Sequence, residues 1–167
     1  SLYIMENTLM SAGSRVPADG KDKIMGSIVF KVPGKPQGKA RARTGYNPKV
    51  GKVTSYTPGK TVLYENYIKT CYMQTTDVVF DHEEPLSVYI NACFEPTKST
   101  SKKQRKRMLN GEVLPTKKPD VDNIVKAVLD ALNGLAYKDD TQVVNVTANK
   151  TYGERAFTEV TIVSIEK

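Results

Sequence analysis

The sequence predicts an α+β fold, a single domain with one mixed β-sheet packed by helices, in the order β-α-β-α-α-β-β. Three observations favour it. The length of 167 residues suits one domain with one hydrophobic core. Hydrophobic residues at 39% and charged residues at 26% are ordinary for a globular protein. Stretches with strand-like alternation and stretches with helical apolar spacing follow one another along the chain.

Four stretches have the pattern of β-strands. They are Ser27–Pro33, Leu86–Phe94, Gln142–Thr151 and Phe157–Ile165. Pro33 and Gly34 close the first strand, because proline and glycine end regular pairing. The second alternates and is rich in β-branched residues, which favour strands. We expect all four to join one sheet.

Three stretches have the spacing of helices. The first is Thr61–Gln74, with apolar residues at Leu63, Tyr64, Tyr67, Ile68 and Cys71; the second opens at Ser101 and ends at Asn110-Gly111; the third is Asp122–Asn133, with an apolar stripe at Ile124, Val125, Val128, Leu129 and Leu132. Ser101 and Gln104 fit a capping box, which starts a short and very basic helix. The third helix has the strongest pattern of the three.

Two segments lie outside these elements. Residues 1–25 show no sustained period, and we expect a flexible N-terminal arm before a domain at 26–167. Residues 34–59 interleave Gly, Pro and cations, and we expect a long loop there. Loops of this length in a compact domain are usually functional or disordered.

The net charge of +7 is unevenly distributed. Residues 31–60 hold eight Lys or Arg and no acid, and residues 98–118 hold eight more against Glu112 alone. Such clusters either stay solvated or face a polyanion. The charge therefore allows two interpretations, a solvated basic surface or a nucleic-acid partner.

Two acids and a lysine gather where the third predicted helix begins. Asp120 and Asp122 can converge only if Asp120 precedes the first helical turn, because residues two apart in a helix point about 200° from each other. Pro119 favours a boundary there. Asp122 and Lys126, four residues apart, share a helical face. A structural interpretation is also open, in which Asp120 is an N-cap and Lys126 pairs with Asp122.

A second acidic pair, Asp139-Asp140, follows the helix and precedes a strand. If packing returns it to the start of the helix, three carboxylates gather in a cation-rich chain. Hard oxygen ligands of this kind suit Mg²⁺ or Mn²⁺. A metal ion there would activate water and neutralise a phosphate, and Lys126 would stabilise the remaining charge.

These residues resemble the signature of the RusA family of Holliday junction resolvases. The resemblance lies in KPDVDNIVKAVLDALNG (residues 118–134), YKDDTQVV (137–144), PGKPQGKARAR (33–43) and YTPGKT (56–61). Together these stretches place the likeness over most of the chain from about residue 26 onward. The block Asp-x-Asp-Asn-x-x-Lys with a later Asp-Asp is fairly specific, whereas the basic loop alone is a weak signal.

The resemblance implies a homodimeric, Mg²⁺-dependent endonuclease, with Mn²⁺ as a substitute, that resolves four-way DNA junctions by paired symmetric nicks in recombination and repair. Members of the family are often encoded by prophages. Asp120, Asp122 and Asp140 would be the catalytic, metal-binding carboxylates and Lys126 the essential lysine, with Asp139 as a further candidate ligand. Residues expected to contact DNA phosphates are Lys35, Lys39, Arg41, Arg43, Lys49, Lys52, Lys117 and Lys118.

The sequence departs from the family pattern at two places. Arg41-Ala-Arg43 stands where the family often has Arg-Pro-Arg, and Pro119 rather than a cation precedes Asp120. The role of Asp130 stays open between orienting Lys126 and forming an ordinary helix salt bridge.

Other functional classes and the setting can be considered from the sequence too. A non-catalytic basic DNA-binding protein, with the acids as caps, remains the alternative function. Cys71 and Cys93 are expected to be reduced core thiols and His82 a surface residue. No apolar run approaches the roughly 18 to 20 residues that span a bilayer, so we expect a cytoplasmic protein without a membrane partner.

Overall fold

The computed structural model describes residues 26–165, so the arm predicted for residues 1–25 lies outside the described part. Its elements are β1 (Ser27–Pro33), β2 (Arg43–Asn47), β3 (Lys52–Tyr56), α1 (Gly59–Thr75), β4 (Leu86–Phe94), α2 (Lys102–Leu109), α3 (Val121–Leu132), the 3₁₀ turn η1 (Asp140–Gln142), β5 (Val143–Tyr152) and β6 (Phe157–Ser164). The predicted α+β fold and the order of its main elements are confirmed.

The central sheet has four strands in the order β1-β6-β4-β5. β6 runs antiparallel to both β1 and β4, whereas β4 and β5 are parallel. Parallel neighbours need a crossover connection between them. In this chain the crossover contains α2, α3 and η1, and therefore all four residues expected to be catalytic.

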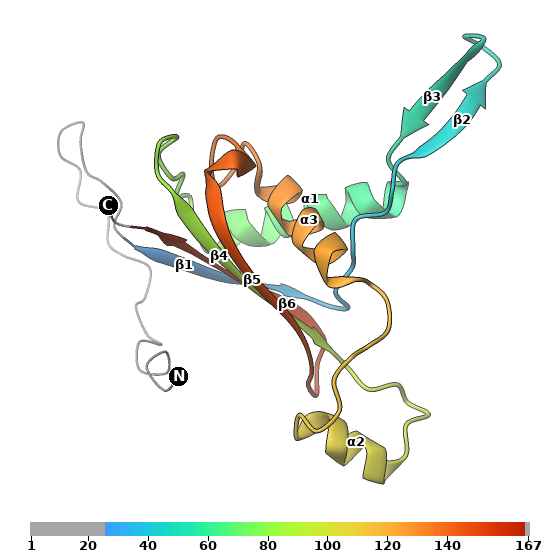
Figure 1. Ribbon diagram of the computed structural model, residues 1–167, viewed down its shortest axis with the longest axis vertical. Helices are drawn as coiled ribbons and strands as arrows, with labels where there is room; N and C mark the ends of the chain where they lie inside the picture. The colour runs from blue at the N-terminus through green and yellow to red at the C-terminus, as the bar shows by residue number, and fades with distance from the viewer. Residues whose placement is uncertain (1–25, 166–167) are drawn as a thin grey trace.

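Helices α1 and α3 pack together on one face of the sheet (Figure 1). In α3 the buried residues are Ile124, Ala127, Val128, Ala131 and Leu132, which includes most of the predicted stripe. In α1 the buried residues are Thr61, Tyr64, Ile68, Cys71 and Tyr72. Leu63 and Tyr67, which the helical spacing had placed on the apolar side, are 71% and 41% exposed.

The segment 34–59 is more ordered than the long loop we predicted. It contains an antiparallel hairpin, β2–β3, paired from Arg43 with Tyr56 to Asn47 with Lys52. The hairpin projects away from the sheet and helices (Figure 1). Its five-residue strands have no buried face, so the sequence shows no hydrophobic alternation by which they could have been predicted.

Several smaller expectations can be compared with the structure. Cys71 and Cys93 are free and buried, as predicted. The basic helix α2 is capped by Ser101, which accepts a hydrogen bond from the Gln104 amide, and it buries no residue. His82 is 60% exposed, as expected of a surface residue. Between residues 26 and 165, no helix is both long enough and apolar enough to cross a membrane.

Candidate active site

Asp120 lies just before the first turn of α3, as predicted, and occupies the N-cap position, but its side chain does not act as the cap that the structural interpretation required. Its backbone is extended and its side chain makes no capping hydrogen bond. An N-cap aspartate usually accepts a bond from one of the first helical amides. Asp122, in the first turn, is exposed as well. The two carboxylates are therefore open to solvent at a helix N-terminus, where the helix dipole favours negative charge.

Lys126 is exposed one turn further along α3. Within residues 26–165 no carboxylate forms an ion pair with its ammonium group, neither Asp122 before it nor Asp130 after it. The salt-bridge interpretation of Asp122 and Lys126 has no support in these contacts. Residues at this spacing still share a helical face, so Lys126 lies on the same side of α3 as Asp122 without an ion pair to it.

Lys39 joins the basic segment to both helices. Its Nζ lies 2.5 Å from Asp130 Oδ2 and 2.9 Å from Glu65 Oε1, and all three side chains are largely buried. Burial acts to lower the pKa of Lys39, but the hydrogen bond to Asp130 and the close negative charge of Glu65 prevail and raise it. The Lys39 amide also donates to the carbonyl of Asn123 at 2.8 Å. The carboxylate of Asp130 is thus bound to Lys39, not to Lys126.

The second acidic pair lies in the turn η1, where Asp139 is a true cap. Its Oδ1 accepts from the Thr141 amide, and Gln142 Oε1 accepts from the Asp139 amide, which completes a capping box. Gln142 Oε1 also accepts from the Lys138 amide at 3.0 Å. The Gln142 side chain therefore fixes the backbone of the turn on one side.

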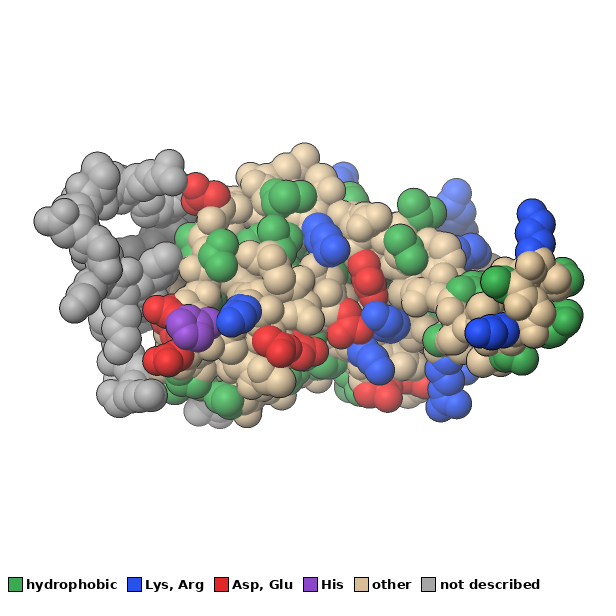
Figure 2. Space-filling model, turned by 90° about the horizontal axis from the view of Figure 1, so that it is seen from above, with side chains coloured by type: hydrophobic (Ala, Val, Ile, Leu, Met, Phe, Trp, Pro, Cys, Tyr) green, Lys and Arg blue, Asp and Glu red, His purple; other side chains and the backbone are tan. Residues whose placement is uncertain are grey.

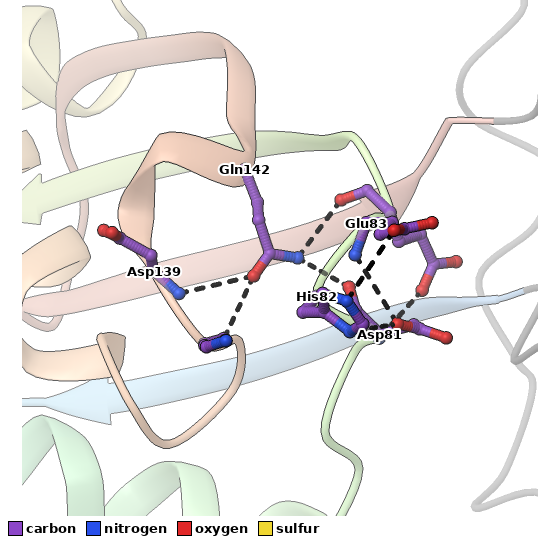
Figure 3. Close-up of polar contacts among 7 residues, drawn as sticks. Asp81, His82, Glu83, Asp139 and Gln142 are labelled. Atoms are coloured by element: carbon purple, nitrogen blue, oxygen red, sulfur yellow. Dashed lines mark hydrogen bonds and ion pairs between the residues drawn. The ribbon is translucent and has the colours of Figure 1, made fainter.

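The other end of Gln142 ties the turn to the segment before β4. Its Nε2 donates to the carbonyls of Asp81 at 2.6 Å and Glu84 at 3.2 Å (Figure 3). Gln142 is only 8% exposed, so these bonds are shielded from water. His82 lies on the outer side of the same segment, with Nδ1 2.9 Å from Asp81 Oδ1. Gln142 was not singled out from the sequence, although its place three residues after Asp139 matches a capping box.

Asp140 lies in a concentration of negative charge. A side-chain hydrogen bond with Asp139 raises the pKa of Asp140, and burial and the charges of Asp139 and Asp130 raise it further. A carboxylate with such neighbours binds a proton or a cation more readily than an isolated one. The turn η1, which carries Asp140, also contacts α3.

The two acidic pairs are separated along α3 within one chain. At a rise of about 1.5 Å per residue, Asp122 and Asp130 are roughly 12 Å apart along the helix axis. Among the described residues, no three His, Cys, Asp or Glu side chains gather closely enough to hold a metal ion. The chain presents Asp120 and Asp122 near the start of the helix and Asp139 and Asp140 beyond its end.

A groove of about 740 Å³ opens beside Asp120. It is lined by Lys35, Pro36, Gln37, Gly38, Lys39, Lys60, Leu63, Tyr64, Tyr67, Lys118, Pro119, Asp120 and Asn123. Three of these lysines, Lys35, Lys39 and Lys118, were predicted to contact DNA; Lys60, Leu63 and Tyr67 were not predicted as site residues. The helical spacing of apolar residues in α1 included Leu63 and Tyr67. That spacing alone could not tell which apolar residues are buried in the core and which are exposed in the groove.

The remaining predicted DNA contacts include those of the hairpin. Arg43 and Lys52 lie on β2 and β3, Lys49 lies in the turn between them, and all three are exposed. Figure 2 shows basic and hydrophobic side chains, and no acidic ones, on the hairpin end of the visible face. Arg41 is exposed just before β2, and the carbonyl of Lys117 accepts a hydrogen bond from Lys150.

Comparison with known proteins identifies the family. A family model described as Endodeoxyribonuclease RusA matches residues 33–163. The chain is also 36% identical over 139 residues to the uncharacterized protein YqaN of Bacillus subtilis (strain 168), an alignment that covers 83% of this chain and 96% of that protein. The chain therefore belongs to the RusA family of endodeoxyribonucleases, a family of Holliday junction resolvases. The resemblance stated from the sequence is confirmed.

Proposed function

We propose that this protein is a Mg²⁺-dependent endonuclease that resolves four-way DNA junctions by paired symmetric nicks, as a homodimer, in recombination and repair. One observation carries the proposal within the family. Asp120 and Asp122 are exposed acids at a helix start without a capping bond or a described ion pair. Asp139, by contrast, caps a turn. Acids that make no capping bond and no described ion pair, beside a groove lined with lysines, are suited to bind a metal cation that in turn binds a DNA phosphate.

The donor chemistry of the acids fits Mg²⁺, with Mn²⁺ as a substitute. We assign Asp120, Asp122 and Asp140 as its ligands, with Asp139 adjacent. Mg²⁺ commonly takes only one or two carboxylates and completes its shell with water and substrate phosphate, so three protein ligands in one chain are not required. When bound, Mg²⁺ supplies a more acidic water and neutralises charge on the phosphate.

The chain's own cations complete the chemistry in this proposal. Lys126 lies one turn from Asp122, where an ammonium stabilises the negative charge that develops on the attacked phosphate. Phosphates on either side of the scissile bond bind to exposed cations. These are Lys35, Arg41, Arg43, Lys49, Lys52, Lys117 and Lys118. Such contacts give affinity that falls with salt and carry no sequence information.

A homodimer fits both the substrate and the separated acidic pairs. Two sites related by a two-fold axis match the symmetry of an open four-way junction and lead to paired nicks. A dimer also provides a way for Asp140 of one protomer to serve the Asp120 and Asp122 of the other. Mixing two inactive variants, Asp120→Asn and Asp140→Asn, tests this. If each site takes residues from both protomers, the mixed dimer contains one intact site and makes single nicks. If each site lies within one chain, the mixed dimer contains no intact site and makes no nick.

The main experiment measures cleavage of an end-labelled synthetic junction and a matched duplex, with Mg²⁺ or with EDTA. We expect Mg²⁺-dependent cleavage of the junction alone. Asp120→Asn and Lys126→Ala should each lower the rate by about 100-fold or more and still bind the junction. Glu154→Gln, an exposed acid in the β5–β6 turn, is the control and should cleave normally. Full activity of either active-site variant rules the assignment out.

A non-catalytic DNA-binding protein is the alternative. It predicts junction or duplex binding with no Mg²⁺-dependent product in any variant. Binding by Asp120→Asn does not separate the two functions, because removal of a negative charge favours DNA binding in both. The appearance of product therefore decides.

A further inference from the structure

The groove beside Asp120 has both positively charged and apolar surface. Binding of DNA phosphates would require only the positive charges, so the apolar surface calls for another explanation. Lys35, Lys60 and Lys118 are exposed on its rim. Within residues 26–165 none of their ammonium groups has an ion pair. Lys39 also lines the groove, but its ammonium is bound to carboxylates. Three free cations thus surround a single lining acid, Asp120, which gives the groove a net positive charge.

The wall formed by α1 is apolar and open. Leu63 and Tyr67, one helical turn apart, are 71% and 41% exposed and both line the groove. Tyr64, between them, is buried and its hydroxyl is hydrogen-bonded to Thr158, so it belongs to the core. An aromatic ring and a leucine left uncovered beside three lysines offer a stacking surface next to phosphate-binding groups.

We infer that this groove binds one unpaired nucleotide of the DNA substrate, with its base against Tyr67 and Leu63 and its phosphates near Lys35, Lys60 and Lys118. The inference rests on the proposed function and deepens it. The volume of about 740 Å³ lies within the range of roughly 300 to 1,000 Å³ of small-molecule pockets. Aromatic side chains bind unpaired bases by stacking on their faces.

Base pairing determines which nucleotides can enter. A base within a duplex has both faces covered by its neighbours, so it cannot lie against Tyr67 unless it leaves the stack. Nucleotides at a branch point have lost stacking on one side and leave at a lower free-energy cost. Because Asp120 lines the same groove, the nucleotide bound there is next to the phosphate that is cut. The groove thus selects branched over duplex DNA and favours some bases at the cleavage position.

The start of α3 holds the groove in shape. Gly38 approaches α3 so closely that a Cβ at this position would lie 2.9 Å from Asn123 Cβ and 3.0 Å from Pro119 Cβ. The neighbouring Lys39 amide donates to the Asn123 carbonyl. Figure 1 shows that the segment between β1 and the hairpin passes the start of α3 and reaches the hairpin near the start of α1. The walls of the groove are therefore fixed relative to Asp120.

Photo-crosslinking tests the inference directly. Synthetic junctions carry a single 5-iododeoxyuridine at successive positions around the branch point and are bound by the full chain with Ca²⁺ in place of Mg²⁺. We expect a crosslink to the tryptic peptide of residues 61–69 from one or two positions next to the branch point, and none from duplex. Tyr67→Phe should keep the crosslink, whereas Tyr67→Ala should lower its yield by at least about fivefold.

The controls separate this inference from the proposed function. Met73→Ala, an exposed residue of α1 outside the groove, should crosslink as the wild type does. Thermal denaturation checks folding, and if Tyr67→Ala does not fold, Leu63→Ala and Lys118→Gln decide by the same loss of yield. Equal yields from wild type and variants, or crosslinks at Tyr46 or Tyr56 of the hairpin instead, overturn the groove inference. If the wild type then still cleaves junctions with Mg²⁺, the proposed function stands; if it does not, that function fails as well.

Discussion

The ammonium group of Lys39 lies 2.5 Å from Asp130 Oδ2, across 91 residues of sequence. Together with Glu65 on α1, this contact connects the segment after β1 to both helices of the layer. Glu65 Oε1 is buried and has no hydrogen-bond partner among the described residues. Lys39 Nζ, 2.9 Å away, is the cation that balances the negative charge of the Glu65 carboxylate. The contact stabilises the arrangement of three segments around the candidate site.

Lys39→Met should destabilise the fold, because it leaves the carboxylates of Glu65 and Asp130 largely buried and without their cation. We expect a loss of about 2–3 kcal/mol in the free energy of unfolding, measured by urea denaturation. Addition of Glu65→Gln to Lys39→Met should recover part of that loss. Lys103→Met, on the exposed helix α2, should leave stability unchanged. A Lys39→Met protein as stable as the wild type would contradict the role given to this contact.

Gly38→Ala should damage the site through packing alone. The added methyl group would be 2.9 Å from Asn123 Cβ and 3.0 Å from Pro119 Cβ, so the basic segment or the start of α3 must shift. We expect a loss of about 1–3 kcal/mol in stability and slower junction cleavage at saturating protein. Gly26→Ala is the matched control, because a Cβ there meets nothing within 4 Å. Unchanged melting and cleavage would show that this contact relaxes freely.

Gln142→Leu should loosen the turn that carries Asp139 and Asp140. The substitution keeps the approximate volume but removes the bonds to the Lys138 and Asp139 amides and to the Asp81 and Glu84 carbonyls. Buried polar groups left without partners cost about 1–3 kcal/mol. Single-turnover cleavage should fall together with the melting temperature. Gln142→Glu keeps the acceptor but places an oxygen against the carbonyls that Nε2 contacted, so it should lower both properties as well. An unchanged melting temperature in Gln142→Leu would contradict the prediction.

Asp140→Asn should stabilise the free protein at neutral pH while it abolishes cleavage. The raised pKa of Asp140 means that the folded chain holds this proton more tightly than the unfolded chain does. That stabilisation is complete below the ordinary value of 3.8 and is lost as the pH rises through the raised folded pKa. The melting temperature of Asp140→Asn should therefore exceed that of the wild type at pH 7 and approach it at low pH. A lower melting temperature at pH 7 would contradict this.

The sheet and helices could be predicted from the sequence because the residues that they bury are apolar and recur with the spacing of a strand or a helix. The strands β1 and β6 and the helix α3 each present a buried set at regular spacing, whereas β4 is buried along most of its length and is marked by its run of apolar residues. The hairpin β2–β3 could not be found this way, since both of its faces are exposed. Exposed strands show no hydrophobic signal, and cross-strand pairing is not visible as periodicity.

The candidate site was predictable in its residues but not in its arrangement. The spacing of Asp120, Asp122 and Lys126 follows from the helix itself, so their shared position at its start could be inferred. The place of Asp139 and Asp140 depends on how the chain turns after α3 and on the contacts of Gln142 with a segment about 60 residues earlier. Contacts at such sequence separation leave no local signal.

Strand β5 has a neighbour on one side only, β4, while β4 and β6 are paired on both sides. The crossover with α2, α3 and η1 enters the sheet through β5. Local opening of β5 would therefore loosen the segment that holds the acids and leave the antiparallel pairing of β1, β6 and β4 in place. Amide hydrogens of β5 should exchange with solvent sooner than those of β6, and the segment around the acids can adjust its position without unfolding the whole molecule.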